Sequence, residues 1–116
     1  MCKLFIGANE DLWKSVSRSL RIDGMVTSVR LENYFWLTLS EIGSRDGLNI
    51  AQLLTKLYHE SIDVGHDLGN FTSFLRVCCM RYLALQLNGH IPTDISIPLS
   101  GLVGDDILKA EFKGVH

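Results

Sequence analysis

The chain has 116 residues, of which 47% are hydrophobic and 21% are charged. This composition excludes a disordered chain, and the length fits one globular domain with a modest core. The formal net charge of -2 excludes a surface that is basic throughout. Because the sequence has neither a run of about eighteen apolar residues nor the pattern of a secretory signal, we expect a cytosolic protein without a membrane span.

Residues 1–24 are predicted to form an N-terminal arm. Within it, Leu4-Phe5-Ile6 is a short apolar run with the character of a strand. Asn9 can cap a brief helix that extends to Trp13, because its side chain can accept hydrogen bonds from the first helical N–H groups.

A strand is predicted from Met25 to Leu31, because its side chains alternate between two faces. Met25, Thr27, Val29 and Leu31 share one face, and Val26, Ser28 and Arg30 share the other. The backbone N–H and C=O groups of a lone strand need a partner. The economical partner is the same strand of a second chain. The alternative partner is Arg18 to Ile22, which Asp23-Gly24 could join to the strand as a hairpin.

Three helices are predicted after the strand. Their expected bounds are Glu32 or Asn33 to Asp46, Asn49 to Ser61 or Asp63, and Asn70 to Leu87. Gly47 and Asn88-Gly89 can close the first and third helices, and Asn49 can cap the second. The third helix is apolar nearly all round, so we expect it to be buried.

The segment after Gly89 forms a separate C-terminal tail, residues 90–116. Pro92 and Pro98 punctuate a run in which apolar residues alternate, and Asp105 could cap a short helix. The tail is too apolar to be a solvated linker. It is therefore expected to pack on the core, residues 25–89, or to dock a partner protein. We identify no internal repeat.

Residues Val26 to Tyr58 resemble a ribbon-helix-helix DNA-binding domain. The residues that carry the likeness are the alternating strand, a helix with Phe35, Trp36, Leu39 and Ile42 on its inner face, the turn Asp46-Gly47-Leu48, and a second helix opened by Asn49. The segment Ser17 to Ile22 and the third helix are similar to the flanks of a bacterial subgroup. The resemblance implies a mainly α fold with a short β-ribbon, built as an intertwined homodimer with an additional third helix.

In that family the ribbon lies in the DNA major groove, and its outward side chains read bases. The resemblance therefore implies double-stranded DNA as partner, bound by a homodimer or a higher oligomer. Base contacts are expected from Val26, Ser28 and Arg30, although Arg30 could simply be solvated. Phosphate contacts are expected from Lys14, Arg18, Arg21, Asn49 and Ile50. The expected dimer core consists of Val29, Leu31, Phe35, Leu39, Ile42, Leu53 and Leu57.

The distribution of charge along the chain agrees with DNA as a partner better than the net charge does. From Lys14 to Arg30 the chain holds four basic residues and one acid, Asp23. Residues 91–116 hold four acids and two lysines, so an acidic tail masks a basic arm in the net charge.

Enzyme and metal functions are disfavoured. The histidines, the aspartates and the pair Cys78-Cys79 lack the spacing that places two ligands on one metal. Cys78 falls on an apolar stripe and is expected to be a small buried hydrophobe with a reduced thiol. We therefore predict no metal site, no cofactor and no catalytic residue.

The sequence thus predicts a non-enzymatic, sequence-specific DNA-binding protein, namely a bacterial transcriptional regulator. The alternative is a dimeric protein-interaction module, similar to an antitoxin, whose C-terminal tail binds a partner protein. Salt dependence separates the two, because phosphate contacts weaken steeply with salt whereas apolar contacts do not.

Overall fold

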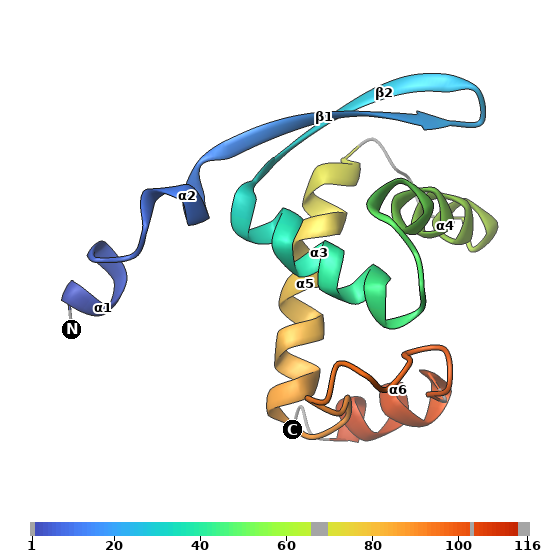
Figure 1. Cartoon of the computed structure of the whole chain (residues 1–116). Helices are drawn as coiled ribbons and strands as arrows, with labels where there is room; N and C mark the ends of the chain where they lie inside the picture. The colour runs from blue at the N-terminus through green and yellow to red at the C-terminus, as the bar shows by residue number, and fades with distance from the viewer. Residues whose placement is uncertain (1, 66–69, 103, 114–116) are drawn as a thin grey trace.

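The computed structural model describes residues 2–65, 70–102 and 104–113 and shows one hairpin lying across a group of helices (Figure 1). In chain order the elements are α1 (Cys2–Ile6), α2 (Glu10–Trp13), β1 (Ser15–Ile22), β2 (Met25–Glu32), α3 (Asn33–Arg45), α4 (Ile50–Asp63), α5 (Phe71–Leu87) and α6 (Gly104–Lys113). None of the helices in the described ranges is long and apolar enough to span a membrane. The mainly α architecture with a short β-ribbon agrees with the prediction.

The hairpin is formed by β1 and β2 of the same chain. The two strands pair antiparallel in the register from Ser15↔Glu32 to Ile22↔Met25. Asp23 and Gly24 form the turn, and both have positive φ angles, 53° and 79°. Two such residues give a primed turn, whose twist matches that of paired strands, and Asp-Gly favours this turn.

The in-chain pairing corrects one prediction. We expected Met25 to Leu31 to pair with the same strand of a second chain, but its partner is β1. The hairpin alternative is the observed one, and the paired segment reaches back to Ser15. One chain therefore builds a complete two-stranded ribbon, although the homodimer itself stays a prediction.

The inner face of the hairpin packs on the helices. One apolar cluster joins Leu20, Val29 and Leu31 of the strands to Trp36, Leu39, Leu53, Leu54, Leu75 and Cys79 of α3, α4 and α5. The indole Nε1 of Trp36 also donates a hydrogen bond to the carbonyl oxygen of Val16, at 2.9 Å. The helices thus fix the inner face and leave the outer face of the ribbon to solvent.

The helix boundaries follow the predicted capping residues. Gly47, with a φ of 71°, follows α3, and Gly89, with a φ of 78°, follows α5. At the start of α4 the Asn49 side chain accepts from the Gln52 N–H, and the Gln52 side chain accepts from the Asn49 N–H. This reciprocal capping box fixes the N-terminus of α4.

Two predictions about local structure are wrong. Leu4-Phe5-Ile6 belongs to helix α1 rather than to a strand. The third helix, α5, is not buried all round, because Val77, Met80, Leu83 and Leu87 are 40–87% exposed. Each helix face buries only what a neighbouring element covers, and α5 has such neighbours on one side.

The C-terminal tail packs on its own chain. Arg45 at the end of α3 is only 5% exposed, and its guanidinium group donates to the carbonyl oxygens of Pro92, Asp94 and Ile97, at 2.9–3.2 Å. Nη1 of Arg45 also donates to the Tyr82 hydroxyl at 3.1 Å. Residues 92–97 of the tail thus contact the end of α3, and a partner protein docked through the tail is not supported.

Candidate nucleic-acid interface

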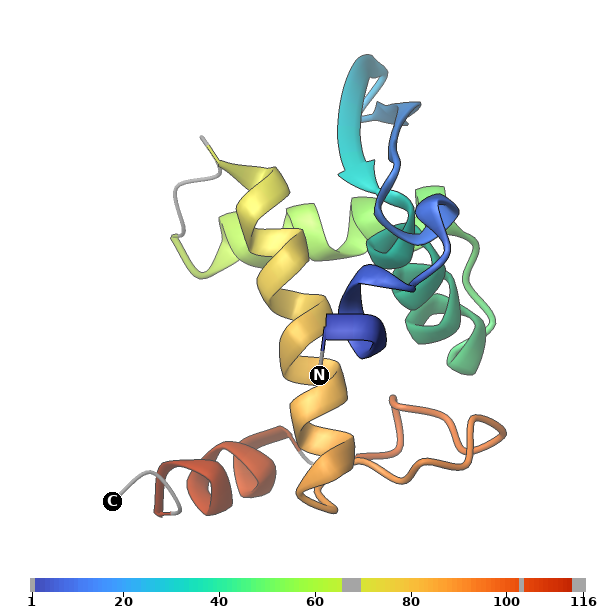
Figure 2. The ribbon, with the colours of Figure 1, turned by 90° about the vertical axis from the view of Figure 1, so that its left-hand side faces the viewer.

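The outer face of the ribbon presents eight side chains in four cross-strand pairs. They are Ser15 with Glu32, Ser17 with Arg30, Ser19 with Ser28, and Arg21 with Val26. All are exposed except Glu32, which is half-buried. Turned by 90°, Figure 2 shows the hairpin at one end of the molecule, beyond α3 and α4. The ribbon is thus attached to the helices through Leu20, Val29 and Leu31 on its inner face, and its outer face is open.

The three residues predicted to read bases lie together on this face. Val26, Ser28 and Arg30 follow one another along β2 and point away from the helices. Sequence reasoning missed that β1 contributes Ser17 and Ser19 to the same surface. The turn signal at Asp23-Gly24 contained that information, because fixing the turn also fixes the register of β1 against β2.

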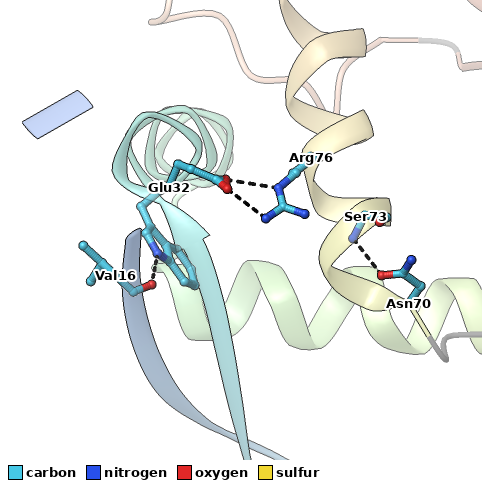
Figure 3. Close-up of polar contacts among 6 residues, drawn as sticks. Val16, Glu32, Asn70, Ser73 and Arg76 are labelled. Atoms are coloured by element: carbon cyan, nitrogen blue, oxygen red, sulfur yellow. Dashed lines mark hydrogen bonds and ion pairs between the residues drawn. The ribbon is translucent and has the colours of Figure 1, made fainter. Parts of the chain in front are cut away.

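The carboxylates near the ribbon are paired. Asp23 at the turn contacts Nε2 of His59 at 2.9 Å. Glu32 at the end of β2 accepts two hydrogen bonds from the Arg76 guanidinium group, at 2.9 and 3.1 Å (Figure 3). These bonds are the main cause that lowers the pKa of Glu32 below its usual value. Arg21 and Arg30 thus give the outer face two cationic side chains, and the acid at the end of β2 is paired with Arg76.

A second polar feature is a hollow of about 640 Å³ between the hairpin and the start of α4. Three residues predicted to contact phosphates line it: Arg18, Asn49 and Ile50. The guanidinium carbon of Arg18 lies 5.0 Å from the centre of the Trp36 ring, an arrangement that orients a cation without neutralising it.

The N-terminus of α4 offers hydrogen-bond donors to this hollow. The capping box occupies the N–H groups of Asn49 and Gln52, and the N–H of Leu53 donates to the Asn49 carbonyl. In the described ranges no hydrogen bond engages the N–H groups of Ile50 and Ala51. Free N–H groups and the positive end of the helix dipole together suit an anion.

The remaining two predicted phosphate-binding residues lie elsewhere. Lys14 is exposed at the base of the hairpin, where it follows α2. Arg21 lies near the turn, on the outer face, directly opposite Val26. The predicted phosphate-binding set is therefore divided among three places on the molecule.

The residues predicted as a dimer core already pack within one chain. Val29, Leu31, Leu39 and Leu53 are buried there, and Phe35, Ile42 and Leu57 are half-buried against the same cluster. Their sharing between two chains stays a prediction.

The cysteines occupy apolar surroundings. Burial raises the pKa of Cys79 to about 12, and burial also raises that of Cys78. Sγ of Cys79 is 3.7 Å from the Phe35 carbonyl oxygen. Within the described segments no three His, Cys, Asp or Glu residues gather in a way that could hold a metal ion. Two residues weighed as ligands, His66 and Asp67, lie outside the described ranges.

Comparisons with known proteins agree with this arrangement. Residues 15–83, well over half of the chain, match the family described as "Ribbon-helix-helix domain". Among solved structures, the chain is similar to an uncharacterized protein from Bordetella pertussis Tohama I, with 47% sequence identity and a TM-score of 0.89. That match covers 94% of this chain and 87% of the other. No curated protein matches.

Proposed function

Since this chain belongs to the ribbon-helix-helix family, we propose that it is a sequence-specific DNA-binding protein that regulates transcription in a bacterial cytoplasm. The hairpin enters the DNA major groove with its outer face toward the bases. The observation that carries the proposal is this exposed face of serines and arginines, which is held from beneath by three helices. The major groove is about 12 Å wide and admits a two-stranded ribbon.

The side chains of β2 supply base contacts in this proposal. Arg30 can donate two hydrogen bonds to the O6 and N7 atoms of a guanine. Ser28 can donate to or accept from several bases, and Val26 can contact the methyl group of a thymine. The alternative is that the Arg30 side chain is only solvated. It predicts no loss of sequence preference when that side chain is removed.

The hollow beneath the ribbon supplies phosphate contacts. Arg18 contributes charge, and the N–H groups of Ile50 and Ala51 contribute donors beside the Asn49 cap. A phosphate seated there would fix the height and register of the ribbon in the groove, because backbone contacts position a protein without reading sequence. Lys14 would add a further phosphate contact at the base of the hairpin.

A binding titration with random duplexes at several salt concentrations tests the proposal. Affinity should fall steeply with salt, because phosphate contacts release counterions. After selection of the preferred sequence, Arg30→Ala should cost about 1–3 kcal/mol on that site and relax the preference there.

Lys109→Ala is the matched control, because it removes one exposed positive charge from α6, at the end of the molecule remote from the hairpin (Figure 1). It should leave both affinity and preference unchanged. The proposal fails if the wild-type protein binds no duplex at low salt, or if Arg30→Ala discriminates as the wild type does.

We further propose that the protein is a homodimer. The support is the apolar surface of α5, where Val77, Met80, Leu83 and Leu87 are exposed in the single chain. Because the ribbon is complete in one chain, this surface rather than strand pairing is the proposed contact. Light scattering after gel filtration should give the dimer mass, and the double substitution Met80→Glu, Leu83→Glu should give the monomer mass. A folded wild-type monomer at micromolar concentration contradicts the proposal.

A further inference from the structure

The strand register contains a local two-fold symmetry. Ser19 and Ser28 are directly opposite each other at the middle of the outer face. In two antiparallel strands, an axis perpendicular to the sheet can be drawn midway between two such opposite residues. A rotation by 180° about this axis exchanges the two strands and keeps each face of the ribbon on its own side. This rotation carries Arg21 onto the position of Arg30, nine residues later in the chain.

The sequence follows the same symmetry. β1 contains Ser19-Leu20-Arg21-Ile22, and β2 contains Ser28-Val29-Arg30-Leu31. The four apolar members are all buried, with exposed fractions of 0–8%, whereas the serines and arginines are exposed. The chain therefore holds a short internal repeat, contrary to our sequence analysis, and its two copies present the same side chains on the outer face.

We propose that Arg21 reads a base as Arg30 does, and that one hairpin recognises a short DNA site with approximate two-fold symmetry. This inference rests on the proposed function and deepens it by naming the kind of site. It also replaces the phosphate contact that sequence reasoning expected for Arg21. The two arginines would contact guanines on opposite DNA strands, because the two-fold axis of the ribbon would coincide with that of the site.

The dimensions suit this reading. Arg21 lies opposite Val26, which is four residues from Arg30 along β2. At about 3.3 Å per residue the two arginines are separated by about 13 Å along the ribbon. That length corresponds to about four base-pair steps, at 3.4 Å each. The separation lets two side chains address different base pairs of one site without competing for the same guanine.

The observed salt bridges also leave Arg21 and Arg30 available for contact with DNA. In the part of the chain that the structure describes, no salt bridge engages either of them. The acid nearest to Arg21 in sequence, Asp23, contacts His59 instead. Arg18, by contrast, lies on the other face of β1, above the Trp36 ring. Its place explains why only one arginine of β1 joins the outer surface.

Of the three outer pairs that the rotation exchanges, one breaks the symmetry. The rotation carries Ser17 onto Val26, so a hydroxyl on one side corresponds to an apolar side chain on the other. The preferred site should therefore be an imperfect palindrome. Its two halves should share the guanines and differ at the base pairs that face Ser17 and Val26.

Selection of bound sequences by the full chain and its variants tests the inference. Arg30→Ala should lose the guanine preference in one half of the site, and Arg21→Ala should lose it in the other half. Each loss should reach about 5- to 150-fold against the mismatched base, the range for one bidentate contact. Val26→Ser should make the two halves alike. The unfolding midpoint of each variant serves as the folding control.

Arg21→Lys separates base reading from phosphate binding, because it keeps the charge and removes the planar pair of donors. A base-reading Arg21 predicts that Arg21→Lys loses preference at the same position as Arg21→Ala. The inference is overturned if Arg21→Ala weakens all duplexes alike, shrinks the salt slope by about one and leaves the preference intact. In that case the proposed function still stands. If the wild type binds no duplex at low salt, both fail.

Discussion

The hairpin and the C-terminal segment 90–102 both lie against α3 or α5, yet they are held in opposite ways. Each strand pairs the backbone groups that face its partner, and apolar side chains together with the hydrogen bond from the Trp36 indole to the Val16 carbonyl attach the hairpin to the helices. The C-terminal segment has no such partner strand in the described ranges, and its carbonyl groups take donors from Arg45. Where the backbone pairs with itself, polar side chains remain available for other molecules.

The arginines show this difference most directly. Arg30 and Arg21 are exposed on the outer face of the hairpin. Arg45 is 5% exposed and donates four hydrogen bonds inside the molecule. The same residue type thus forms a buried hydrogen-bond network at the end of α3 and is a candidate recognition group at the other end of the molecule.

The substitution Arg45→Met should break the Arg45 hydrogen-bond network and cause the largest loss of unfolding free energy. It removes the donors of three tail carbonyls and of the Tyr82 hydroxyl, and hydrogen bonds from a charged donor are worth more than neutral ones. We expect unfolding in urea to show a loss of about 3 kcal/mol. Proteolysis should then cut within residues 90–102.

Arg30→Met is the matched control, since it makes the same change on an exposed side chain. Its unfolding free energy should stay within about 0.5 kcal/mol of the wild type. Equal losses of unfolding free energy in Arg45→Met and Arg30→Met would contradict the proposed difference between the C-terminal segment and the hairpin.

Tyr82→Phe should weaken the same Arg45 hydrogen-bond network by a smaller amount. The hydroxyl donates to Oε2 of Glu41 at 2.6 Å and accepts from Arg45. We expect a loss of about 1–2 kcal/mol at neutral pH, measured by urea unfolding.

The pH dependence of this variant provides a second readout. Burial, followed by the hydrogen bond to Glu41, raises the pKa of Tyr82 above its usual 10.0. A raised pKa contributes stability below the unfolded value, and that stability is lost as pH rises through the folded value. The difference between wild type and Tyr82→Phe should therefore shrink above pH 10. A difference that grows with pH would contradict this account.

The smallest expected effect concerns the base of the hairpin. Glu32→Gln should cost about 0.5 kcal/mol at pH 7, because the pair with Arg76 is partly exposed. Since the pKa of Glu32 is lowered by Arg76, the stabilisation is present above the usual 4.5 and is lost as pH falls through the folded pKa. The two proteins should have equal stability in strong acid. Glu60→Gln, on an exposed acid of α4, is the matched control and should cost no measurable stability at pH 7.

Capping residues and apolar periodicity predicted the helices well. Asn49, Asn70 and Gly89 mark ends that depend on local backbone geometry, and they act as expected. The exposed side of α5 was not predictable in this way, because burial depends on which elements are near. Arg45 was missed for the same reason, since its acceptors lie about fifty residues further along the chain.

Part of the candidate interface was predictable and part was not. Val26, Ser28 and Arg30 share a face by simple alternation, which holds in any register. The contribution of Ser17, Ser19 and Arg21 depends on the pairing of β1 with β2, and sequence reasoning preferred a second chain as the partner. The hollow that joins Arg18 to the start of α4 required the packing of both elements, which no local pattern specifies.

A ribbon made within one chain also changes how the protein folds. Its paired residues are at most 17 positions apart, so closing the turn at Asp23-Gly24 brings all of them into reach. Hairpins of this kind form within about 1–10 μs, without waiting for an encounter between molecules. The rate at which this ribbon appears during refolding should therefore be independent of protein concentration, whereas a ribbon assembled from two chains would form more slowly in dilute solution.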